Sequence, residues 1–222
     1  MLTVSTCFGY SLRMSRSGAL TRRKKPVGRY HHGDLRRALV DEAVRTIDAR
    51  GVDQLTLRTI GERLGVSRTA LYRHFSDKQA LLAAVSTEGF RTLRLALTDA
   101  WERQGRGRPG FEAMAVAYVR FAVTHPAHYR VMFGRFVESV AGNADLQCEA
   151  DGAFQVLVGA LVAQQEAGIV RRDAPDLQAR FVWAAVHGTA MLAIDGQLKG
   201  DEAGEALNAY AIERLWSAIV AS

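Results

Sequence analysis

The stretch TLRTIGERLGVSRTALYRHFSDK, from Thr56 to Lys78, decides the fold of this chain. It predicts a short helix from Thr56 to Leu64, a tight turn at Gly65, a second short helix from Arg68 to Arg73 and then a new helix start. Glycine adopts the left-handed turn conformation at little cost. This order is typical of a helix-turn-helix, in which one helix braces and the next enters the major groove of DNA.

The second helix of this motif is short and carries mostly polar groups, so only Leu71 and part of Tyr72 are expected to be buried. We expect Arg68 to take a guanine edge, and Thr69 and Ala70 to meet a thymine methyl group. Phosphate contacts, which give affinity and register, are assigned to Tyr72, His74 and Lys78. A helical hairpin that merely resembles a DNA reader is the alternative.

The first helix of the motif contributes its N-terminal end. Thr56 and Arg58 stand where a bracing helix crosses the DNA backbone, and the helix dipole there favours a phosphate. Arg58 has a second option, because its side chain is long enough to reach a base.

The charge of the chain is unevenly placed. The 222 residues carry a net charge of +6, yet residues 1–78 hold 16 Lys and Arg against 7 Asp and Glu, and residues 79–222 hold 13 against 16. A basic head on a mildly acidic body favours a polyanion as the partner of the head alone. A soluble protein with a basic tail is the other interpretation of the charge.

Composition excludes several classes of protein. A hydrophobic fraction of 48% with 23% charged residues is typical of a folded domain. Cys7 and Cys148 are far apart and in no metal-binding spacing, so neither a zinc site nor a disulfide framework is predicted. The first residues lack the features of a secretory signal, and no segment has the length of apolar sequence that a membrane span needs. We expect a cytoplasmic protein without metal or cofactor.

Three- and four-residue apolar spacing recurs along the chain, whereas two-residue alternation does not, so the predicted fold is all-α. We expect a basic tail over residues 1–28, a three-helix domain with the helix-turn-helix over 29–78 and a helical body over 79–222. Asp34 is a fair N-cap for the first helix, and Ser76 with Gln79 resembles a capping box for the long fourth helix. The segment GRGRPG, residues 105–110, predicts a loop, and a later helix is expected from Pro175 to Leu198.

These motifs resemble the DNA-binding region of the tetracycline-repressor-like (TetR) family of bacterial regulators. The resemblance runs from about Tyr30 to Val85 and rests on YHHGDLRRALVDEAV, on LYRHF, on Lys78 and on the pair Leu81 and Leu82. It implies a homodimeric repressor whose C-terminal domain binds a small molecule. It also implies that the operator faces Thr56, Arg58, Ser67, Arg68, Thr69, Ala70, Tyr72, Arg73, His74 and Lys78.

In the body, WAAVHG (Trp183 to Gly188) and HPAHYRVMF (His125 to Phe133) resemble one subgroup of these regulators, marked by a Trp–His–Gly signature. Trp183 and His187 share a helical face, which is typical of a pocket wall, of a dimer seam or of an ordinary core. Aromatic and methionine side chains on two successive helices likewise suit an adaptable apolar pocket or plain core packing. The predicted effector pocket contains Tyr118, Phe121, Met132, Phe133, Phe154, Trp183 and His187.

The last two helices are the expected dimerisation elements, although burial within one subunit explains much of their apolar surface. A helix-turn-helix that reads a palindrome needs two-fold symmetry, which favours the dimer. The predicted interface contains Phe181, Ala184, Gly188, Met191, Leu215 and Trp216.

No catalytic constellation is recognisable, so an enzyme is not expected. The sequence predicts a transcription regulator that binds double-stranded operator DNA, most simply a repressor released by a small apolar or amphipathic ligand. A ligand-independent DNA-binding protein, or an activator of the same fold, is the alternative.

Overall fold

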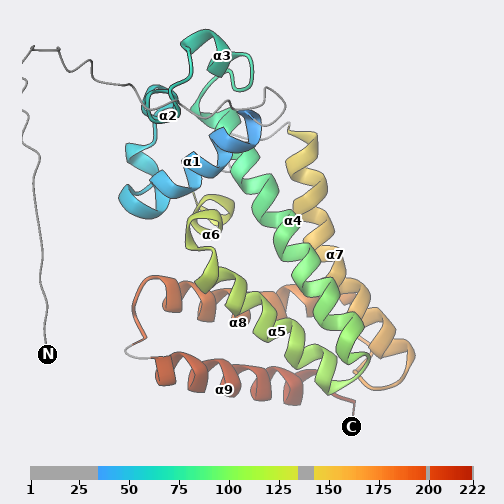
Figure 1. Ribbon diagram of the computed structural model, residues 1–222. Helices are drawn as coiled ribbons and strands as arrows, with labels where there is room; N and C mark the ends of the chain where they lie inside the picture. Colours follow the sequence, from blue (N-terminus) through green and yellow to red (C-terminus); the bar gives the residue numbers. More distant parts are fainter. Residues whose placement is uncertain (1–34, 135–142, 199–200, 222) are drawn as a thin grey trace, which may run out of the picture. The chain divides into compact units, whose positions relative to one another are not determined.

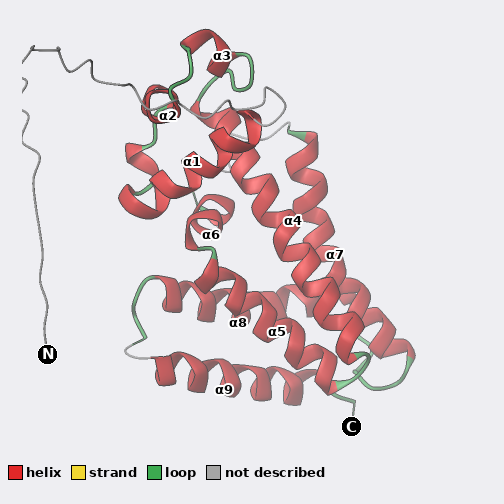
Figure 2. Ribbon diagram, in the orientation of Figure 1, coloured by secondary structure: helices red, strands yellow, loops and turns green. Residues whose placement is uncertain are grey.

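The computed structural model describes residues 35–134, 143–198 and 201–221, and these residues are almost entirely helical (Figures 1 and 2). The predicted basic tail, the Asp34 cap and the first residues of the predicted three-helix domain lie outside the described residues. The elements are α1 Leu35–Arg50, a 3-10 turn at Val52–Gln54, α2 Leu57–Leu64, α3 Arg68–Tyr72, α4 Lys78–Gln104, α5 Arg108–Thr124, α6 Pro126–Phe133, α7 Ala144–Glu166, α8 Pro175–Ile194 and α9 Asp201–Ile219.

Two separate hydrophobic clusters form inside the unit that begins at His32. The head cluster joins α1, α2 and α3, and it includes Leu39, Ile60 and Leu71. The body cluster lies among α4, α5 and α7–α9. The all-α prediction is confirmed, and the only extended pairing within the described ranges is a single bridge between Val170 and Val220.

Two helices contribute to both clusters. The first turns of α4 place Leu81, Leu82 and Val85 in the head cluster, and its later turns place Leu93 in the body cluster. The short helix α6 does the same with opposite faces, because Ala127 and Val131 lie in the head cluster while Tyr129 and Met132 lie in the body cluster. Head and body therefore share two helices rather than a flexible linker.

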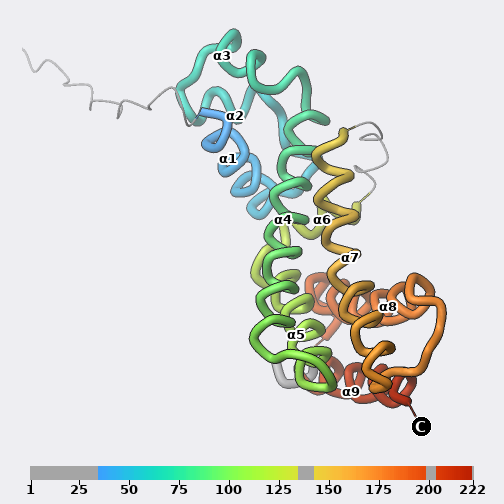
Figure 3. Tube along the Cα trace, turned by 90° about the vertical axis from the view of Figure 1, so that its right-hand side faces the viewer, coloured from blue at the N-terminus to red at the C-terminus, as the bar shows by residue number. Residues whose placement is uncertain are grey.

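The long helices α4 and α7 run side by side in both views of the unit (Figures 1 and 3). Helix α5 packs on α4 and α8, and α9 covers α8 and α5. By length and composition, α7 is the one helix within the described ranges that could cross a membrane. Its Ala160 and Leu161 belong to the body cluster.

Three predicted boundaries are corrected by the structure. Helix α4 is capped by Asp77 and not by Ser76, because the Asp77 carboxylate accepts the backbone N–H of Ala80 at 2.8 Å. Helix α8 ends at Ile194, four residues before the predicted end, where Gly196 takes a left-handed conformation. Helix α5 begins at Arg108, so the predicted GRGRPG loop is only half as long.

The early start of α5 has a local cause. Pro109 fits the first turn of a helix, where no intrahelical N–H is required. Gly110 then meets the end of α4 so closely that a Cβ would overlap the carbonyl oxygen of Gly105 and lie 2.9 Å from the Trp101 ring. Gly110 therefore permits close packing of α5 on the end of α4, whereas Gly105 and Gly107 take positive φ values in the loop between them.

Candidate nucleic-acid interface and ligand cavity

The helix-turn-helix is built as the sequence predicts. Thr56 caps α2 with its hydroxyl oxygen, which accepts the backbone N–H of Thr59 at 3.1 Å. Gly65 ends α2 in the left-handed conformation, at φ 66° and ψ 28°. Ser67 then caps α3 by accepting the N–H of Ala70 at 3.2 Å. These caps fix the first turns of both helices.

Helix α3 is anchored from one side only. Leu71 is 2% exposed in the head cluster, and Phe75 just beyond the helix is 3% exposed. The opposite face is open, since Tyr72 is 48% exposed and Arg68, Thr69, Arg73 and His74 are all exposed. Of the predicted base-reading and phosphate-contacting side chains, Arg68, Thr69, Tyr72 and His74 are thus exposed, whereas Ala70 is half-buried against the head cluster.

The cations of the head fall into paired and unpaired groups. Arg63 donates to the carboxylate of Glu42 at 2.9 Å, and Arg45 pairs with the same group. Burial opposes ionisation of Glu42, but the hydrogen bonds from Arg63 and Arg45 outweigh it and lower its pKa. Arg63 therefore braces α2 against α1. Arg68 and Arg73 have no ion pair within the described part of the chain, which leaves them available to an anion.

Arg58 is exposed but not free. Its side chain forms an ion pair with Glu62, four residues later, at 2.8 Å, and both side chains are largely exposed. That hydrogen bond raises the pKa of the guanidinium. Surface pairs of this kind are weak, so a phosphate could compete with Glu62 for the guanidinium.

Lys78 is placed differently from the other predicted contact residues. Its ammonium group donates to the carbonyl of Val52 at 2.8 Å and lies 3.5 Å from that of Asp53, so it ties the start of α4 to the turn after α1. This structural role was not foreseen from the sequence. Its predicted phosphate contact stays a prediction.

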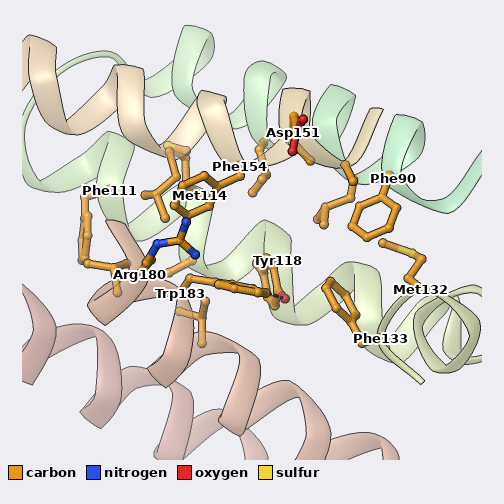
Figure 4. A pocket seen from close by; sticks show the side chains of 18 residues that line it. Phe90, Phe111, Met114, Tyr118, Met132, Phe133, Asp151, Phe154, Arg180 and Trp183 are labelled. Atoms are coloured by element: carbon orange, nitrogen blue, oxygen red, sulfur yellow. Dashed lines mark hydrogen bonds between the residues drawn. The ribbon is translucent and has the colours of Figure 1, made fainter. Parts of the chain in front are cut away.

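A cavity of about 360 Å³ opens between α4, α5, α7 and α8, with the end of α6 at one side (Figure 4). Its volume falls within the range of small-molecule sites, and its lining is mostly apolar. Five of the seven residues of the predicted effector pocket line it: Tyr118, Met132, Phe133, Phe154 and Trp183.

The other two predicted pocket residues lie elsewhere. Phe121 is buried in the body core, where it stacks on His125 with ring centroids 5.0 Å apart. His187 is behind the cavity wall, where the Tyr129 hydroxyl approaches its Nδ1 at 2.7 Å. Of the two, His187 contacts residues of the lining, namely Tyr118, Phe133 and Trp183.

A polar cluster of four side chains joins three helices at that wall. The Tyr118 hydroxyl of α5 accepts the indole N–H of Trp183 at 2.9 Å and the hydroxyl of Tyr129 at 3.1 Å. It also lies 3.1 Å from Nδ1 of His187. Burial raises the pKa of Tyr118 to about 12, raises that of Tyr129 and lowers that of His187. Near neutral pH the cluster is therefore uncharged.

Sequence reasoning missed several residues of the cavity. Phe90, Leu93 and Leu97 of α4 line it, and a spacing of three and four residues indicates a buried helix face without distinguishing a cavity wall from a filled core. Arg180 and Asp151 contribute the charged groups of the lining. Arg180 is three residues before Trp183 on α8, so the two side chains lie on the same face of the helix. Once Trp183 is assigned to the cavity wall, this spacing predicts that Arg180 lies there too.

The predicted dimer surface changes on α9. Leu215 is 4% exposed in the core of its own chain, and the half-buried Trp216 packs against Phe111 with ring centroids 5.5 Å apart, so both side chains contact their own subunit and their place in an interface stays a prediction. Met191 of α8 is also half-buried against the body core. Among the described side chains of α9, the large hydrophobic residue that is exposed is Tyr210, at 60%.

Helix α8 retains an open apolar face. Phe181 is 52% exposed, and Ala184 and Gly188 are exposed on the same side of the helix. Leu177 and Leu192 extend this face by one turn at each end.

No group of three His, Cys, Asp or Glu side chains that could hold a metal ion occurs in the described segments.

Two family models match the chain. Residues 39–85 match the model described as bacterial regulatory proteins of the tetR family, and residues 111–215 match a tetracyclin repressor-like C-terminal domain. The first match contains the whole helix-turn-helix, and the second contains most of the residues around the cavity.

Individual relatives agree with these models. The chain is 30% identical over 168 residues to the HTH-type transcriptional regulator BetI of Cronobacter sakazakii, a match that covers 72% of this chain and 76% of that protein. It is 28% identical over 97 residues to an uncharacterized HTH-type transcriptional regulator of Bacillus subtilis, YobS, of which the match spans half the length.

Among solved structures, a protein of unknown function from Rhodococcus sp. RHA1 is similar over 86% of this chain and 98% of its own, with 34% identity and a TM-score of 0.76. The TetR family regulator PfmR of Thermus thermophilus shares the fold at 20% identity and a TM-score of 0.65, over 81% of this chain and 97% of its own.

Proposed function

The chain belongs to the tetracycline-repressor family of helix-turn-helix transcriptional regulators, and on that premise we propose that it is a repressor that leaves its operator when a small molecule fills the body cavity. The observation that carries the proposal is the pairing of an open, cationic α3 with a mostly apolar cavity in one unit. A ligand-independent DNA-binding protein or activator would have no need of that cavity.

For DNA binding, the proposed contacts are those of the predicted operator-facing set, with α3 in the major groove. Arg68 reads a base, because its guanidinium is exposed and has no carboxylate partner among the described residues. Arg58 contacts the backbone after leaving Glu62. Binding takes place in the cytoplasm, and no catalytic step is involved.

The proposed assembly is a homodimer formed through the open face of α8 with part of α9. Two copies of α3 would then enter successive major grooves about 34 Å apart. The Trp–His–Gly subgroup assignment also belongs to this proposal. It is supported by the place of Trp183 and His187, which hold the cavity wall through Tyr118 and Tyr129.

Ligand and DNA communicate through the two shared helices. Phe90 of α4 and Met132 of α6 line the cavity, while Leu82 of α4 and Val131 of α6 lie in the head cluster. A ligand that displaces either helix therefore moves the platform of α3 and changes the spacing of the two recognition helices. The coupling free energy is expected to be about 1–3 kcal/mol and must be reciprocal.

The test is the selection of genomic DNA fragments by the purified full-length protein, followed by gel shifts with the selected sites. Arg68→Ala should cost about 1–3 kcal/mol in binding free energy and relax preference at one base pair. Arg172→Ala removes the same charge from an exposed position between α7 and α8, and it serves as the control. Binding should also weaken steeply as salt rises.

Selection of no site, or equal affinity of the wild-type protein and Arg68→Ala for the selected site, would contradict the proposed reading of bases. Tight binding to DNA that no tested amphiphile weakens would favour the ligand-independent alternative instead.

A further inference from the structure

Arg180 breaks the apolar character of the cavity at its edge. It belongs to α8, is exposed as a residue and still lines the cavity. Its guanidinium carbon lies 5.1 Å above the ring of Phe154 on α7 (Figure 4). This cation–π contact holds the planar group against α7.

The guanidinium has no carboxylate partner within the described ranges. The arginines of α4 that face α7 are different, because Arg91 and Arg94 both pair with Glu149 of α7, at 2.8 and 2.9 Å. Asp151 also lines the cavity, but its carboxylate accepts the side-chain amide of Gln147 at 2.8 Å and does not pair with Arg180. Toward the described residues, Arg180 therefore keeps its hydrogen-bond donors free.

The inner wall cannot hold a charge. The Tyr118 hydroxyl already accepts two hydrogen bonds, and burial keeps Tyr118 protonated and His187 neutral near pH 7. Around this wall lie Leu93, Met114 and other apolar side chains. A ligand's charged end would therefore lose its hydration there without compensation.

We propose that the effector is an amphipathic anion, whose carboxylate pairs with Arg180 while its apolar body fills the cavity. This inference rests on the proposed function and names the chemical class of its ligand. A guanidinium presents parallel N–H donors that match a carboxylate, and the Phe154 ring already fixes its plane. The apolar lining requires the rest of the molecule to be hydrocarbon, as chain or ring.

Asp151 defines the opposite possibility. An amphipathic cation would pair with its carboxylate and be repelled by Arg180, so reversed preference is a distinct outcome of the experiment. Three probes separate these cases: decanoate, decanol and decyltrimethylammonium, which share one apolar chain and differ in head group.

Binding of each probe to the full-length protein is measured by calorimetry and by the change in tryptophan fluorescence, to which Trp183 at the cavity wall contributes. The wild-type protein should bind decanoate at least about tenfold more tightly than decanol, as expected for a charge-assisted hydrogen bond. Arg180→Met keeps an apolar side chain over Phe154 and should abolish that preference. Arg172→Met, in the exposed segment before α8, should preserve it.

Equal binding of decanoate and decanol by the wild-type protein would overturn the proposal, as would a decanoate preference that survives Arg180→Met. Tighter binding of decyltrimethylammonium, lost in Asp151→Asn, would overturn it in favour of a cationic ligand. Gel shifts separate this result from the proposed function. If decanoate binds through Arg180 but does not weaken the DNA complex, the proposed ligand class stands and release by ligand is refuted. If decanol releases the DNA and decanoate does not, release by ligand stands and the proposed ligand class is refuted.

Discussion

Replacement of Gly89 by alanine tests the contact between α4 and α6, through which the cavity is proposed to reach the head. A Cβ at this position would overlap the Sδ of Met132 and would lie 3.0 Å from its Cγ and 3.2 Å from the Cβ of His128. Met132 and His128 are both buried. The helices approach so closely here that the added methyl group must displace one of them or force Met132 toward the cavity.

The expected cost follows from this geometry. Overpacking of a core costs about 1–3 kcal/mol, and the lower half applies because the Met132 side chain can swing into the cavity that it lines. Alanine also gains about 0.5–1 kcal/mol over glycine in a helix, which hides part of the cost. Gly159→Ala on α7 supplies the matched control, since no atom lies within 4 Å of its Cβ position. The difference between the two variants isolates the packing term.

Urea unfolding followed by circular dichroism, at one protein concentration, measures that difference. With a slope of about 2–3 kcal/mol per molar urea, the midpoint of Gly89→Ala should lie roughly 0.3–1 M below that of Gly159→Ala. The double variant Gly89→Ala/Met132→Ala should lose less stability than the sum of the two single variants, because the added methyl group no longer meets the methionine side chain. Equal midpoints for the two single variants, or a cost unchanged by Met132→Ala, would refute the close contact.

Three further outcomes are expected from stability measurements. Asp77→Ala should lower the free energy of unfolding by about 1 kcal/mol through loss of the α4 cap, whereas Ser76→Ala should change it by no more than about 0.5 kcal/mol. The reverse order would restore Ser76 as the cap. Leu71→Ala should cost about 2–5 kcal/mol and weaken operator binding, and retention of both properties would show that α3 is anchored elsewhere. Burial lowers the pKa of His128 below 6.5, so the folded protein binds fewer protons than the unfolded chain, and its stability should fall as the pH drops from that value. In His128→Leu the urea midpoint should fall less over the same pH range. An identical pH profile for the variant and the wild-type protein would exclude His128 as the source.

Local sequence signals located the helix-turn-helix because its parts are set by neighbouring residues. Thr56, Gly65 and Ser67 act within three or four positions of themselves, and the structure places them as two caps and a left-handed turn. The Asp77 cap was missed although its signal is local too, since Ser76 and Asp77 both suit an N-cap and only the backbone direction distinguishes them.

The sequence predicted part of the cavity lining, because it marks which helix faces are buried. Aromatic and methionine side chains at helical spacing mark a buried face, and burial alone does not separate a cavity wall from a filled core. Phe121 and Tyr118 lie on the same helix, yet Tyr118 reaches the cavity while Phe121 is covered by His125. The interhelical packing of α5 decides between them.

Spacing and charge along the chain determined the all-helical class, the helix-turn-helix and the side of α3 that meets solvent, because hydrophobic periodicity and capping act over a few residues. Tertiary structure alone decided which cations are free, which apolar side chains enclose a cavity and where Arg180 stands. Arg63 and Arg68 look alike in sequence, but Glu42 of another helix holds only the first. Contacts between helices far apart in the chain depend on how those helices pack, and no local pattern encodes that packing.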